Sequence, residues 1–237
     1  MQTAEVDVIP LHMAEVSFPP GHPQEGDHGP VRAFAVVHPD GVLLFDTGVG
    51  VGEADIDERF RPVRHPLSEA LSAHNLELAD VQSVVNSHLH FDHCGQNVLF
   101  PGMPIFVQAG EYRAALAEAS YTVPAWVDFP GAAYELLEGD AEILRGVRLV
   151  PTPGHTPGHQ SMVLSTGQGT VVLAGQAIYT EEEWRGSTDP RRSGQPSAWD
   201  AAAYEHSVAR LRQLDPRRVF FSHDETVWVA EPRPPFQ

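Results

Sequence analysis

The feature that most constrains this chain is a short run of metal-binding side chains that follows an apolar stretch. His88, His90, Asp92 and His93 lie within six positions of one another, directly after residues 81–86. Imidazoles and carboxylates are ligands that zinc and similar divalent ions prefer, and side chains at i and i+2 of an extended backbone point the same way. One ion cannot take all four groups. The run therefore suggests two adjacent ions, the first bound by His88 and His90 and the second by Asp92 and His93.

A histidine-rich surface loop is the alternative interpretation of this run. The chain has 13 histidines, so chance His-X-His pairs are expected. However, no packing or turn requirement asks for three histidines and an aspartate at this spacing. The pattern favours the metal site.

Length and composition predict one domain that spans residues 1–237. With 42% apolar residues, a chain of 237 residues can bury a substantial core without a second domain. No run of eighteen apolar residues and no secretory signal pattern is visible, so we expect neither a membrane span nor export. A cytoplasmic location is the prediction. The single Cys94 agrees with a reducing compartment.

Charge limits the classes of partner. Lys and Arg number 15 against 32 Asp and Glu, which gives a formal net charge of -17 at pH 7. Such a surface repels the phosphate backbone of nucleic acids and anionic lipid headgroups. We expect a small neutral or weakly polar substrate, and neither nucleic acid nor membrane as a partner.

Strand and helix patterns alternate along the chain, which predicts an α/β fold. Candidate ligands follow several of the predicted strands, where open α/β folds bind ligands. His155 lies in the turn 152–159, and His223 follows residues 219–222. The predicted strands are 5–11, 31–37, 41–46, 81–86, 104–108, 147–151, 160–165, 170–174 and 218–222. The predicted helices are 66–74, with Ser68 as N-cap, 110–119 and 197–214. Residues 18–30 are a predicted loop and 38–41 a predicted hairpin turn, and residues 120–137 are unassigned.

Three separated elements together resemble the metallo-β-lactamase superfamily over nearly the whole chain. They are the run from His88 to His93, His155 within Gly-His-Thr-Pro-Gly-His, and the late His223. Within the superfamily the chain is most similar to the N-acyl-homoserine lactonases, in residues 87–93, 138–140 ahead of Gly146, 151–161, 179–180 and 221–224. The resemblance implies an αββα sandwich, in which two mixed β-sheets are flanked by helices.

The resemblance also implies roles for individual residues. Asp46, in Asp-Thr-Gly, is expected to hold a ligand histidine in one tautomer from behind. Asp92 is expected to shuttle a proton, Tyr179 to donate a hydrogen bond to the substrate near the scissile bond, and Phe91 to contact the substrate. His159 is expected to be a packed structural residue. The implied metal ligands are His88, His90 and His155 for one ion, and Asp92, His93 and His223 for the other.

The chain departs from the family pattern at Gln176. The family usually has Gly-Asp here, with the aspartate bridging both ions, whereas this chain has Gly175-Gln176. Two divalent ions about 3.5 Å apart repel by on the order of 19 kcal/mol at an effective dielectric constant of about 20, so a bridging anion matters. Gln176 offers at most a neutral carbonyl oxygen. Three interpretations stay open: a dinuclear site with a looser second ion, a mononuclear enzyme, and a degenerate, inactive fold.

The function that the resemblance implies is a metal-dependent hydrolase that opens the ring of N-acyl-homoserine lactones or related lactones by attack of a metal-bound hydroxide. The cofactors are then two divalent ions, with zinc expected and iron, manganese or cobalt as alternatives. The partner is a small lactone or ester, and the protein is a monomer or homodimer. The alternatives are another hydrolase of the superfamily, a mononuclear iron enzyme such as a persulfide dioxygenase, and a binding protein without catalysis. Cys94 is expected to be a small buried residue, and the loops that carry Met13, Phe18, Tyr121, Trp126 and Phe129 are expected to wall the pocket.

Overall fold

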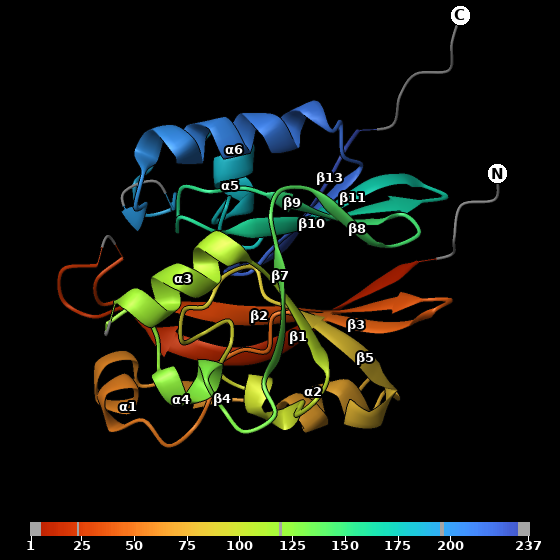
Figure 1. Cartoon of the computed structure of the whole chain (residues 1–237). Helices are drawn as coiled ribbons and strands as arrows, with labels where there is room; N and C mark the ends of the chain where they lie inside the picture. The colour runs from red at the N-terminus through yellow and green to blue at the C-terminus, as the bar shows by residue number, and fades with distance from the viewer. Residues whose placement is uncertain (1–5, 23, 119, 195–196, 232–237) are drawn as a thin grey trace, which may run out of the picture.

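The computed structural model describes residues 6–22, 24–118, 120–194 and 197–231, which form two β-sheets packed face to face with helices on their outer sides (Figure 1). The strand order is β4-β1-β2-β3-β5-β6-β7 in the seven-stranded sheet and β13-β12-β11-β10-β9-β8 in the six-stranded sheet. This arrangement confirms the predicted αββα sandwich.

The seven-stranded sheet comes entirely from the first part of the chain. Its strands pair antiparallel from β4 to β3 and parallel from β3 to β7, so the sheet is mixed. The strands are β1 (Asp7–Ser17), β2 (His28–His38), β3 (Gly41–Phe45), β4 (Val63–Arg64), β5 (Val81–Val85), β6 (Pro104–Gln108) and β7 (Ala133–Leu137).

The six-stranded sheet comes entirely from the second part. Its strands pair antiparallel except for the parallel pair β11 and β12, which are joined by a helical crossover. The strands are β8 (Ala141–Leu144), β9 (Val147–Pro151), β10 (Gln160–Thr166), β11 (Gly169–Leu173), β12 (Arg218–Phe221) and β13 (Asp224–Val229).

The helices cover the outer faces of both sheets. In Figure 1, α5 and α6 lie above the six-stranded sheet, and α1, α2 and α4 lie below the seven-stranded sheet. None of the helices in the described ranges is long and apolar enough to cross a membrane. The helices are α1 (Ala54–Phe60), α2 (Leu67–Ser72), α3 (Ala109–Ala117), α4 (Pro124–Val127), α5 (Glu181–Trp184) and α6 (Ala201–Gln213), with 3₁₀ turns η1 (Leu78–Asp80) and η2 (Asn97–Leu99).

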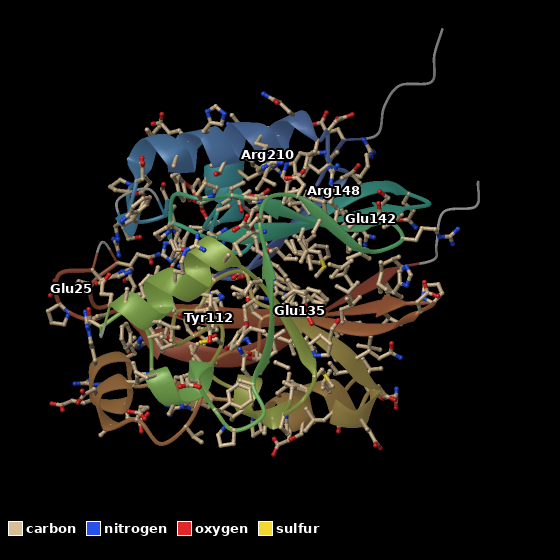
Figure 2. All side chains as sticks on the ribbon, in the orientation of Figure 1. Glu25, Tyr112, Glu135, Glu142, Arg148 and Arg210 are labelled. Atoms are coloured by element: carbon tan, nitrogen blue, oxygen red, sulfur yellow. The ribbon has the colours of Figure 1, made fainter. Side chains whose placement is uncertain are left out.

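Alternating side chains divide the core into layers. One cluster, which includes Phe34, Leu149 and Phe220, fills the space between the sheets. A second cluster, which includes Leu44 and Leu67, packs the seven-stranded sheet against its helices. Burial of these faces drives the packing, at about 25 cal/mol per Å² of apolar surface. In Figure 2, Arg210 lies on α6, and its guanidinium donates to the Pro151 carbonyl at the end of β9, 2.8 Å away.

Several predicted boundaries are wrong for identifiable physical reasons. The helix expected from residue 197 begins at Ala201, because Asp200 is extended (φ -140°) and its carboxylate accepts from the Ala202 and Ala203 N–H groups. Ser68 is not the cap of α2; the helix begins at Leu67, after Pro66. Glu5 and Ala119, included in predicted elements, lie outside the described residues.

The segments around the first two strands and residues 120–137 also differ from expectation. The first strand is longer than predicted because it continues through a β-bulge to Ser17, and β2 begins at His28, inside the predicted loop. Met13 is therefore a fully buried strand residue and does not lie in a pocket loop. The unassigned stretch forms α4 and β7. Seven further elements lie outside all the predicted strands and helices: α1, β4, η1, η2, β8, α5 and β13.

Candidate metal centre

The candidate ligands all lie in connections that follow strands. Residues 87–93 follow β5, the turn that carries His155 follows β9, Gln176 follows β11, and His223 lies between β12 and β13. The two sheets thus contribute to one centre, although their ligands are far apart in the sequence.

The first ligand set consists of three imidazoles. His90 Nδ1 lies 3.1 Å from His88 Nε2 and 3.2 Å from His155 Nε2. Tetrahedral zinc with bonds of about 2.0–2.1 Å places ligand atoms about 3.3 Å apart. The spacing of the three nitrogens fits such an ion.

The second set consists of one carboxylate and two imidazoles. Asp92 Oδ2 lies 3.6 Å from His93 Nε2 and 3.7 Å from His223 Nε2. The His88 and His93 rings, one from each set, have centroids 4.1 Å apart. The structure therefore brings together all six residues that the sequence predicted, as two adjacent groups of three.

Unpartnered polar atoms test whether these groups fit metal ions. Among the described residues, five buried side-chain atoms have no hydrogen-bond partner: His93 Nε2, His223 Nε2, Gln176 Oε1, His155 Nδ1 and Ser222 Oγ. Burying a polar atom without a partner costs about 1–3 kcal/mol, so such atoms need a ligand. Imidazole nitrogens with a carboxylate are a donor set for zinc and its neighbours in the first transition row. The residues present fit two such ions.

Asp46 fixes the orientation of the His93 ring through the ring nitrogen Nδ1, which leaves Nε2 for an ion. Its Oδ2 lies 2.8 Å from His93 Nδ1 and accepts from Ser87 Oγ at 2.8 Å, while Oδ1 accepts from the Ser87 N–H at 2.7 Å. With the proton held on Nδ1, the Nε2 lone pair of His93 points towards Asp92. Asp46 adopts φ 66°, a left-handed conformation that turns the chain at the end of β3.

His223 and His159 have contrasting environments. His223 Nδ1 lies 3.0 Å from the Pro30 carbonyl, which it donates to, and Nε2 stays free for an ion. His159 uses both nitrogens: Nδ1 lies 2.9 Å from Thr152 Oγ1, and Nε2 accepts from the Gln176 N–H at 2.9 Å. The His159 ring therefore supports the backbone at Gln176.

Burial keeps the first set neutral. It lowers the pKa of His88 and His155 well below the usual value, with the other histidines adding to the effect. Burial also lowers the pKa of His90 to about 4, against the opposing influence of Asp92. Neutral imidazoles are the form that binds metal.

The second set carries the negative charge. Burial raises the pKa of Asp92, but His93 and His223 outweigh it, and the net shift is downward. Burial lowers the pKa of His93, but Asp92 and Asp46 outweigh it, with help from the Gln176 side chain, and the net shift is upward. The Gln176 side chain therefore lies beside His93.

Tyr179 covers the second set. Its ring stacks on His223 with centroids 4.8 Å apart and an interplanar angle of 23°. Burial, followed by the charge of Asp92, raises the pKa of Tyr179, so the phenol keeps its proton. The Tyr179 N–H donates to Glu183 Oε2 at 2.6 Å, which fixes the backbone at this position.

Phe91 lines a cavity that opens beside the first set. The cavity has a volume of about 660 Å³ and also includes His90 and Tyr121 in its wall. The Phe91 and Phe60 rings have centroids 4.3 Å apart. The remaining lining residues are apolar on one part of the wall and charged on another: Ile56, Val123, Pro124, Ala125, Glu53, Asp55, Arg59, Ser120 and Thr122. Of the other proposed pocket residues, Phe18, Trp126 and Phe129 are buried.

Glu111 is a supporting residue that the sequence analysis missed. Its Oε1 accepts from the Leu89 N–H at 2.9 Å and the Tyr121 hydroxyl at 2.6 Å; its Oε2 accepts from Thr156 Oγ1 at 2.7 Å and the Gly158 N–H at 3.2 Å. It thus joins the loops of His88, His90 and His155 to the cavity wall. Nothing in the sequence separates it from an ordinary acidic residue in the first turn of a helix.

Cys94 lies outside both ligand sets. Its thiol is fully buried and contacts the Leu89 and His90 carbonyls at 3.4 and 3.3 Å. Burial raises its pKa to about 12, so it is not a thiolate at neutral pH.

The chain is similar to known proteins over most of its length. A family model described as the metallo-beta-lactamase superfamily matches residues 26–223. An N-acyl homoserine lactonase of a Bacillus species is 33% identical over 212 residues, covering 82% of this chain and 81% of that protein. The N-acyl homoserine lactonase AttM of Azorhizobium caulinodans is 29% identical over 232 residues, covering 87% and 86%. A solved N-acyl homoserine lactone hydrolase, with the product N-hexanoyl-L-homoserine at its catalytic metal centre, superposes with a TM-score of 0.75 at 29% identity, covering 95% of each chain.

Proposed function

The chain belongs to the metallo-β-lactamase superfamily, and from this we propose that it hydrolyses the ring ester of N-acyl-homoserine lactones or related lactones. The superfamily and the metal centre make it a metal-dependent hydrolase. The choice of substrate is supported by two relatives that are named lactonases and by a related structure with a ring-opened product at its metal centre.

The observation that carries the proposal is the position of the cavity. It opens at His90 of the first ligand set and has an apolar wall at Phe91 and Phe60. A substrate with its carbonyl at the ions places an attached acyl chain in this cavity. An acyl-homoserine lactone has both the ester carbonyl and the attached acyl chain.

Residues of this chain have separate roles around the reacting ester. When bound, the ions supply Lewis acidity and lower the pKa of water, so that hydroxide is available near neutral pH. The Asp92 carboxylate stays ionised and is able to take and return a proton. The Tyr179 phenol stays protonated and donates a hydrogen bond to the oxygen on which negative charge develops. Phe91 binds the acyl part.

For Gln176 we propose a neutral oxygen ligand and a second ion that is held loosely. The support is its buried, unpartnered Oε1 beside His93. Zinc per chain is measured in Glu225→Gln, which keeps every residue of the two buried ligand sets and removes a carboxylate from an exposed His-Glu-Glu cluster elsewhere on the chain. About two ions per chain at saturation contradict the mononuclear alternative, and one ion per chain contradicts the dinuclear proposal. The cytoplasmic location and the oligomeric state stay predictions.

A lactone panel tests the function. Metal-loaded protein is mixed with acyl-homoserine lactones of several chain lengths and with simple γ-lactones, and released acid is titrated. We expect turnover that requires metal and favours the acylated lactones. Saturable binding without acid release means a non-catalytic binding protein and contradicts the proposal.

Tyr179→Phe tests the hydroxyl in the mechanism. We expect kcat to fall about a hundredfold, the usual effect of removing one oxyanion donor, while zinc content stays that of the wild type. Tyr112→Phe, in which a tyrosine of α3 loses its hydroxyl, is the matched control. Unchanged kinetics in Tyr179→Phe removes the residue from the mechanism.

A further inference from the structure

A β-bulge in β1 changes which way its side chains face. The register passes from His12 paired with Arg32 to Ala14 paired with Val31, so Met13 has no partner of its own. Before the bulge, Val8 faces the core between the sheets and Leu11 faces the helices; after it, Ala14 and Val16 face the helices. Residues three apart normally lie on opposite faces of a strand. Because of the bulge, His12 and Glu15 share the face that looks towards the other sheet.

Three metal-binding side chains meet at this position. Glu15 Oε1 lies 3.3 Å from His12 Nε2, and Glu225 Oε1 lies 3.7 Å from His12 Nδ1. One donor atom from each residue can be chosen so that all three lie within 4.8 Å of one another. The ring of His65 packs edge-on against His12, with centroids 4.9 Å apart.

We propose that His12, Glu15 and Glu225 form a third metal site, separate from the two ligand sets of the hydrolytic centre, which binds a zinc-like divalent ion. The mixture of imidazole and carboxylate selects zinc and its neighbours over calcium or magnesium, which take oxygen ligands. The side chains of His12, Glu15 and Glu225 are 35%, 41% and 73% exposed, so the ion has direct access from solvent and is held more weakly than a buried one.

The charge around the site favours a cation. The Arg32 guanidinium, which interacts with the charge of Glu225, donates to the Asp224 carbonyl at 2.7 Å. Glu15, Glu225 and Arg32 together carry a net negative charge before an ion binds.

The site joins the two sheets. His12 and Glu15 belong to β1 of the seven-stranded sheet, whereas Glu225 belongs to β13, the edge strand of the other. An ion here closes a loop of more than two hundred residues and binds only the folded chain, so it raises stability by mass action.

Zinc counting under buffered free zinc tests the site. The wild type, His12→Ala, Glu225→Gln and the matched control His206→Ala, which removes an exposed histidine of α6, are dialysed at a series of free zinc concentrations. Zinc per chain is then measured by mass spectrometry, and the melting temperature by calorimetry. We expect the wild type and His206→Ala to bind one more zinc than the other two variants at the upper end of the series, and to gain thermal stability as it binds.

Three outcomes would overturn the proposal. The first is equal zinc in all four proteins at every concentration. The second is loss of the extra zinc from His206→Ala as well. The third is displacement of the extra zinc by calcium or magnesium, because these ions do not select an imidazole ligand. The side chains of Glu225 and His206 are exposed and that of His12 is half-buried, and circular dichroism checks that each variant folds as the wild type does.

Discussion

The two ligand sets differ in the charge that their residues bring. Three neutral imidazoles form the first set, and Asp92 is the only anion among the three ligands of the second. Gln176 adds an oxygen next to His93 without adding charge. Because two ions repel strongly at short distance, the missing carboxylate weakens whichever ion binds second.

Gln176→Asp measures this effect directly. We expect the affinity for the second zinc to rise at least about tenfold, the change that smaller alterations around a metal ion produce. Gln168→Asp, in the exposed turn between β10 and β11, adds the same charge away from the centre and is the control. The readout is zinc retained during competition with a chelator. Equal retention in both variants would show that Gln176 does not contact the ions.

At the scale of elements, two helices fix the loop that carries His155. The Asp200 N–H at the start of α6 donates to the Gly154 carbonyl at 3.0 Å, and the Gly158 N–H donates to Glu111 on α3. Gly154 has φ +139°, and an added Cβ would lie 2.3 Å from Tyr204 Cα on α6. The loop is therefore placed by backbone contact, with no room for a side chain.

Gly154→Ala should separate α6 from this loop. We expect a loss of about 3 kcal/mol in the free energy of unfolding, because the clash is with backbone, together with weaker zinc binding at the first set. Gly52→Ala is the control, since Gly52 also has a positive φ (+92°) but no atom within 4 Å of the added Cβ. That variant should lose only about 1 kcal/mol. Denaturant titration measures both; equal losses would mean that close packing at Gly154 is unimportant.

The sequence predicts elements best where local chemistry determines them. The ligand run after β5 and the hairpin between β2 and β3 depend on neighbours in the chain. The bulge at Met13 depends on the pairing of β1 with β2. Three of the four hydrogen bonds of Glu111 come from residues 22, 45 and 47 positions away. Such long-range contacts leave no periodic signal. Asp200 is an intermediate case, because an aspartate before an alanine run is a recognisable N-cap.

At the scale of the whole molecule, buried histidines link stability to pH. Burial lowers the pKa of His90 to about 4, of His159 to about 3 and of His223 to about 4. In the unfolded chain these groups titrate near about 6.5. Between pH of about 6.5 and 4 the unfolded chain binds protons that the folded chain does not, so stability falls as the pH falls. The lowered pKa values of His88 and His155 act in the same direction, and the raised pKa of His93 opposes them, as one group against five.

Metal-free protein should therefore lose melting temperature steadily from pH 7 to pH 5. Zinc-loaded protein should start higher and lose more over the same range, because His93 must also give up its proton to bind an ion. Calorimetry after dialysis against a chelator, compared with zinc-loaded samples at each pH, measures the difference. A melting temperature of metal-free protein that is flat or rises over this range would contradict the assignment of neutral imidazoles.

The origin of each sheet in one half of the chain has a consequence for fragments. Residues up to 137 build the first sheet and carry His88, His90, Asp92 and His93, whereas residues from 141 build the second and carry His155 and His223. A chain cut at Gly139 would thus give two pieces, neither with a complete ligand set. We expect them to reassociate through their apolar faces, and zinc to tighten this complementation at least about tenfold, because the ions bind only the joined pair. Ultracentrifugation of the mixed fragments with zinc and with chelator would measure the affinity between them. The metal centre would then hold together two halves that were made separately.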